Sequence, residues 1–168
     1  MNACIATIDL AKTMLIDAIL AWIHFLLAFL LVGALVAEAF ILRLPINGRV
    51  ARLLARVDLF YGASAGLLIV AGVSRLVWGA KGWAYYQGDS FFWAKMGTFA
   101  LVGLISILPT MTFLRWTKAA KASETFVVTE NEAKRVRRYV VAETHLIALL
   151  LLFAVFMARG MLHMQASP

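Results

Sequence analysis

The chain has 168 residues, of which 63% are hydrophobic and 15% are charged, and its formal net charge is +7. A soluble domain of this length would expose too much apolar surface, so the composition indicates an integral membrane protein. The basic residues flank apolar runs instead of forming a separate basic face, which argues against a nucleic-acid partner, and the single Cys4 excludes an internal disulfide and a cysteine-rich metal site.

Four apolar runs predict four membrane-spanning helices in a single domain that covers residues 1–168. We place the spans at about residues 16–42, 57–79, 92–115 and 138–162, each close to the ~20 residues that cross the hydrocarbon core. The first run is expected to be retained rather than cleaved, because Asp9, Lys12 and Asp17 interrupt any signal-peptide pattern. Gly62 and Gly66 in the second run have the small-xxx-small spacing that lets helices approach closely.

The three connections differ in composition. Pro45, Asn47 and Gly48 end the first apolar segment, and the second connection carries Trp83 and other aromatic residues suited to the membrane interface. In the third, Thr129 and Glu132 have the spacing of a capping box that would open the last helix.

Eleven of the sixteen basic residues lie in or beside the first and third connections. They are Arg43, Arg49, Arg52, Arg56, Arg115, Lys118, Lys121, Lys134, Arg135, Arg137 and Arg138. The positive-inside rule assigns this side to the cytoplasm. The sequence therefore predicts an all-α, up-and-down four-helix bundle in the bacterial inner membrane, with several passes and both termini outside.

Ionisable residues within the apolar runs form two predicted layers. His24 and Glu38 are fourteen positions apart, as are His145 and Arg159, so each pair shares one helix face. By depth, an outer layer holds His24 with the cations Arg75, Lys95 and Arg159. An inner layer holds Glu38, Glu143 and His145, which we interpret either as a proton relay or as a structural hydrogen-bonded group. Further members could come from the start of the second helix: Arg56, Asp58 and Tyr61.

The outer layer predicts a cofactor site because its three cations have no acidic residue nearby except Asp89 in the loop, and therefore need an anion. Haem b fits this requirement: His24 would bind the iron, while Arg75, Lys95 and Arg159 would hold the propionates. The alternative is that the three cations extend to lipid headgroups. A second ligand from His145 is not expected, since it lies something like 10 Å away along the membrane normal.

Short motifs carry two resemblances. Trp22-Ile-His24, Gly33 to Glu38, Phe92-Trp-Ala-Lys95 and Met157-Ala-Arg-Gly160 resemble a family of small bacterial four-helix membrane proteins classified as a domain of unknown function. A looser likeness, through a first-helix histidine, Trp93-Ala-Lys95 and Asn131-Glu132, is to the HemJ type of protoporphyrinogen oxidase, a haem-binding membrane enzyme. That resemblance implies a haem-linked His24 and a Lys95 that faces substrate or propionate.

Three functional hypotheses follow. The first is a haem b membrane protein, and so a candidate oxidoreductase, that transfers electrons or oxidises a porphyrin-like or quinone-like substrate. The second is a non-enzymatic membrane subunit or assembly factor whose polar residues only fix packing. The third is a carrier of small anions or protons, for which four helices leave little room unless the protein oligomerises, for instance as a homodimer. The expected partners are the lipid bilayer and a quinone, porphyrin or respiratory protein.

Overall fold

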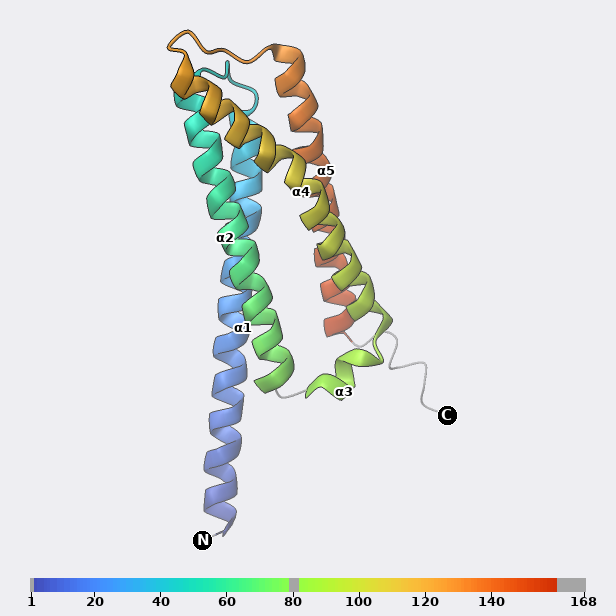
Figure 1. Ribbon diagram of the computed structural model, residues 1–168. Coiled ribbons are helices and arrows are strands. Elements are labelled where there is room, and N and C mark those ends of the chain that lie inside the picture. Colours follow the sequence, from blue (N-terminus) through green and yellow to red (C-terminus); the bar gives the residue numbers. More distant parts are fainter. Residues whose placement is uncertain (1, 79–81, 160–168) are drawn as a thin grey trace.

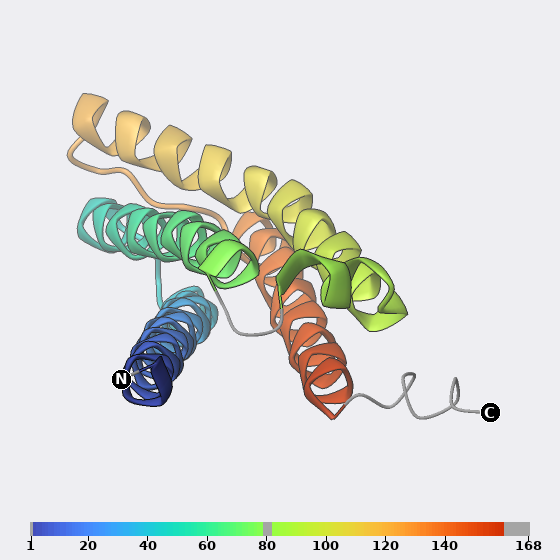
Figure 2. The same cartoon turned by 90° about the horizontal axis from the view of Figure 1, so that it is seen from below.

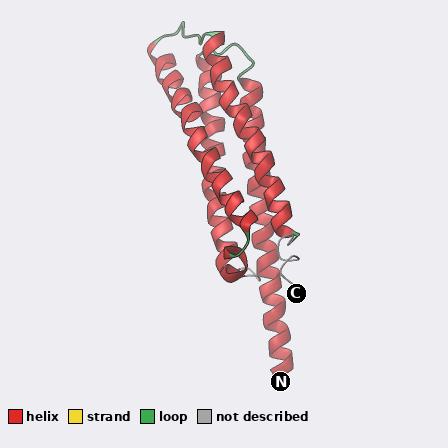
Figure 3. Cartoon of the chain, turned by 90° about the vertical axis from the view of Figure 1, so that its right-hand side faces the viewer, coloured by secondary structure: helices red, strands yellow, loops and turns green. Residues whose placement is uncertain are grey.

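The computed structural model describes residues 2–78 and 82–159, with side chains for 11–78, 83 and 86–159. The described chain is all helical apart from its connections (Figure 3). Four long helices, α1 (Asn2–Ile41), α2 (Gly48–Trp78), α4 (Ser90–Ala122) and α5 (Glu130–Ala158), are each long and apolar enough to cross a membrane. A short helix, α3 (Gly82–Gln87), lies between α2 and α4. The predicted all-α four-helix fold is confirmed.

The long helices form a ring in the order α1, α2, α4, α5. In the described residues α1 contacts α2 and α5, and α4 contacts the same two helices. The backbones of the diagonal pairs, α1 with α4 and α2 with α5, do not come into contact there. Figures 1 and 2 show α1 paired with α2 and α4 paired with α5. The N-terminal part of α1 extends beyond the ends of the other helices (Figures 1 and 3).

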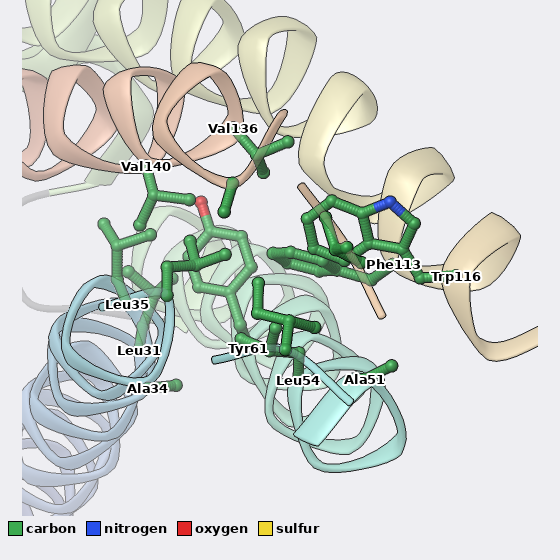
Figure 4. Close-up of a cluster of buried hydrophobic side chains, with 14 of the residues drawn as sticks. Leu31, Ala34, Leu35, Ala51, Leu54, Tyr61, Phe113, Trp116, Val136 and Val140 are labelled. Carbon is green, nitrogen blue, oxygen red and sulfur yellow. The ribbon is translucent and has the colours of Figure 1, made fainter. Parts of the chain in front are cut away.

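The best-packed region lies at the end of the bundle that carries the first and third connections. Each long helix supplies a side chain with almost no exposure: Leu35, Leu54, Phe113 and Val140 (Figure 4). The two connections lie together there, since the Val128 amide donates to the Ile46 carbonyl at 3.0 Å. Apolar burial therefore fixes this end of the bundle.

Local hydrogen bonds begin two of the helices. The Asn47 side chain accepts from the amides of Arg49 and Val50 at the start of α2, and the Asp89 carboxylate accepts from the Phe91 amide at 2.8 Å at the start of α4. Such side chains satisfy amides that have no partner within the helix. Asp89 is thereby engaged in capping.

The predicted capping box at the start of α5 is only half right. Thr129 is the N-cap residue, but its side chain makes no capping hydrogen bond. Glu132 instead accepts from Arg115 at 2.5 Å and from the Trp116 indole at 3.0 Å, both on α4. A tertiary contact between two helices has displaced the local motif.

Candidate functional site

Three helices bring an outer group together: His24 on α1, Arg75 on α2 and Lys95 on α4. The charges of Lys95 and Arg75 both act on the His24 imidazole, and Arg75 acts on Lys95. His24 packs against the backbone of α2 at Gly72, where an added Cβ would lie 3.6 Å from the imidazole Cε1. The predicted outer residues from these three helices therefore share one region of the bundle.

The outer group has polar atoms without partners. The Nδ1 atom of His24 and the Nε atom of Arg75 are buried and make no hydrogen bond. Neither Arg75 nor Lys95 takes part in an ion pair, since both ion pairs of the described residues lie near the third connection. Two cations beside an imidazole without a carboxylate produce a positive region that favours an anion.

Arg159 stands apart from this group. It ends α5 with an exposed side chain, and no interaction joins it to His24, Arg75 or Lys95 within the described part of the chain. The structure thus brings together two of the three cations that the sequence assigned to the outer layer.

The inner group gathers polar side chains from all four long helices. Glu38 on α1 and Glu143 on α5 are each 1% exposed, and Asp58 on α2 is 7% exposed. Tyr61 on α2 donates to Glu143 Oε2 at 3.4 Å, and Thr110 on α4 donates to Asp58 Oδ1 at 2.9 Å. The charges of Asp58 and Glu143 both act on the Glu38 carboxyl group.

The three carboxyl groups of the inner group have no cationic partner. None belongs to either ion pair of the described residues, and one oxygen each of Glu38 and Glu143 is buried without a hydrogen bond. Thr110 is the member that sequence reasoning missed. The available signal was a polar side chain in the middle of an apolar run, which is costly in lipid unless it is bonded.

His145 does not join the inner group. Its side chain is exposed, and Nδ1 lies 2.7 Å from the carbonyl of Val141 on its own helix. Glu143 and His145 are two positions apart, and residues at that spacing do not face the same side of a helix. The His145 imidazole, which the sequence analysis placed beside Glu38, therefore lies on the face of α5 that points away from the bundle interior.

A largely apolar cavity of about 300 Å³ lies between the two polar groups, and all four long helices line it. Ala28 and Phe99 line it one helical turn inward from His24 and Lys95, whereas Tyr61 of the inner group forms part of its wall. Along the bundle the order is therefore imidazole and cations, apolar cavity, then carboxyl groups.

Neither group has the geometry of a metal cluster. Within the described residues no set of three or more His, Cys, Asp and Glu side chains could hold a metal ion. His24 is a single donor, so iron bound there would need a macrocycle to supply its other ligands.

Comparison with known proteins gives a family but no activity. No curated protein and no solved structure matches the chain. Residues 16–161 match a family model described as "Predicted membrane protein (DUF2214)". This range covers nearly all of the four long apolar runs and contains both polar groups. The first of the two resemblances is confirmed, and the chain belongs to the DUF2214 family of predicted membrane proteins.

Proposed function

We propose that the chain is a membrane protein that binds haem b at the outer group and acts in electron transfer or in oxidation of a lipid-soluble substrate. The supporting observation is the convergence of His24, Arg75 and Lys95 without a carboxylate, with buried nitrogen atoms that lack partners. In the bacterial inner membrane that we propose as its location, the end of the bundle that carries most basic residues would face the cytoplasm.

Each residue has a distinct role in this proposal. His24 supplies the one imidazole nitrogen for iron, while the Arg75 guanidinium and the Lys95 ammonium hold propionates. Gly72 leaves room for the ring of His24, since a larger residue would press on it. When bound, haem supplies one-electron chemistry, and the surrounding helices orient it and exclude water.

An absorption spectrum tests the proposal. Protein expressed with ample haem and purified in detergent should show a Soret band that sharpens on reduction. His24→Ala should lose the band, and Arg75→Gln combined with Lys95→Gln should lower haem affinity by tenfold or more. His145→Ala is the matched control, because that imidazole is exposed and distant in sequence from the outer group. A colourless wild-type protein, or an unchanged band in His24→Ala, would refute haem binding.

The inner group favours a second candidate function, which is proton transport. Ionisable side chains inside a membrane commonly belong to proton relays, and here three carboxyl groups lie buried without a cation. Liposomes with an internal pH dye should show flux through the wild-type protein and a large loss with Glu38→Gln, but no loss with the exposed Glu130→Gln. A protein with neither haem nor flux would support the non-enzymatic subunit.

A further inference from the structure

The cavity between the polar groups is kept open by glycines. Gly62 and Gly66 on α2 and Gly103 on α4 line it, and an added Cβ at any of the three would meet no atom within 4 Å. The predicted close helix approach at Gly62 and Gly66 is not seen within the described chain, because no other part of it lies within 4 Å of an added Cβ. Larger side chains at these positions would occupy empty space.

The same glycines mark a lateral opening. All three are exposed although they line the cavity, and they come from the adjacent helices α2 and α4. Because these helices are apolar and long enough to lie in the bilayer, this opening faces lipid. A molecule dissolved in the bilayer could enter here without crossing water.

The lining restricts the chemistry of an occupant. It contains no charged side chain among the described residues, and its hydroxyl groups are those of Tyr61 and Ser106. Tyr61 donates to Glu143 at 3.4 Å and Ser106 donates to the Gly103 carbonyl at 2.9 Å, so Tyr61 makes the longer bond and is the hydroxyl for which a ligand oxygen would compete. The volume of about 300 Å³ is at the lower end of the range for ligand pockets.

We infer that this cavity binds a neutral, lipid-soluble ring compound with hydrogen-bond acceptors, of the quinone class, which enters from the bilayer between α2 and α4. A quinone carbonyl accepts from a hydroxyl group, and its ring suits an apolar wall. Binding does not depend on haem. Only a role for the quinone as a redox substrate rests on the proposed function.

The test measures the melting temperature of the protein in nanodiscs with a short-chain quinone such as decylubiquinone. A ligand at a hundred times its Kd should raise the Tm by about 5–10 °C. Gly103→Leu should abolish this rise because the new side chain fills the cavity. Gly97→Leu is the matched control: Gly97 lies on the same helix, is exposed, has open space at its Cβ and does not line the cavity.

Two results with the quinone would overturn the inference: no rise in the Tm of the wild-type protein, or an equal rise with Gly103→Leu. A third is the same Gly103-dependent rise with a saturated fatty acid, which would indicate that the cavity binds acyl chains. If Gly103→Leu does not fold, a photoreactive quinone on wild-type protein gives the answer. Labelling should fall within the lining segments 28–32, 61–69, 99–106 and 147–151, and labelling outside them counts against the cavity. His24→Ala should lose the Soret band yet keep the rise, which separates this inference from haem binding.

Discussion

Tyr61 on α2 and Glu143 on α5 form a hydrogen bond across the diagonal of the bundle, with 3.4 Å between the hydroxyl and Oε2. The backbones of α2 and α5 do not touch in the described residues, so these side chains bridge the interior. Figure 4 shows the Tyr61 hydroxyl directed toward α5 beside Val140. The same tyrosine lines the apolar cavity, and it therefore connects that cavity to the inner carboxyl groups.

Tyr61→Phe should destabilise the protein. Glu143 is 1% exposed and its other oxygen already lacks a partner, so the variant leaves the whole carboxyl group without a hydrogen bond. A buried polar group that loses its partner costs about 1–3 kcal/mol. The Tm in detergent should fall by several degrees. Tyr139→Phe, on an exposed side chain of α5, should leave the Tm nearly unchanged, and equal effects would contradict the bridge.

Glu132→Ala should destabilise more than Glu130→Ala. Glu132 ties α5 to α4 through Arg115 and the Trp116 indole, whereas Glu130 pairs only with Lys134 on its own helix. An exposed ion pair contributes little to stability. The Trp116 nitrogen, however, belongs to a buried side chain, so we expect Glu132→Ala to lower the free energy of unfolding by about 1–2 kcal/mol. Chemical unfolding of both variants provides the measurement. The reverse ranking would show that the interhelical contact is unimportant.

Much of the fold follows from the sequence because bilayer thickness sets the length of an apolar run. The helices extend past the predicted membrane spans: α4 continues to Ala122, beyond the span end near 115, and α5 begins at Glu130, ahead of the span start near 138. The early start of α5 agrees with the predicted cap at Thr129. Hydrophobicity detects only the part of a helix that lies in hydrocarbon. Polar turns continue the helix beyond it and pair with each other, as Glu132 and Arg115 do.

The polar groups show what helical spacing can and cannot predict. His145 and Arg159, fourteen positions apart, do share a face, but both side chains are exposed, so that face points outward. Glu143, with Ile147 and Leu150 one and two turns further along, marks the inward face. Spacing reports which residues lie together on a helix. The direction of that face depends on packing against the other helices.

Gly72 offers a test of the outer group that leaves every polar residue intact. An added Cβ would lie 3.6 Å from the His24 ring, an ordinary contact, so Gly72→Ala should be tolerated. Gly72→Leu should displace the imidazole and reduce the Soret absorbance by at least half, if haem is the guest. Gly97→Leu, which meets open space, should retain the wild-type spectrum. Full absorbance in Gly72→Leu would mean that the position of His24 does not control binding.

Orientation in the membrane can be measured with single cysteines in a Cys4→Ser background. Ser123 and Gly88 are exposed residues near opposite ends of α4. The basic residues concentrate at the Ser123 end, and the positive-inside rule predicts that this end lies in the cytoplasm. An impermeant maleimide should therefore label Gly88→Cys in intact spheroplasts, and Ser123→Cys only after permeabilisation. The opposite pattern would invert the bundle and move the His24, Arg75 and Lys95 group to the cytoplasmic face, where any anionic guest would have to arrive from inside the cell.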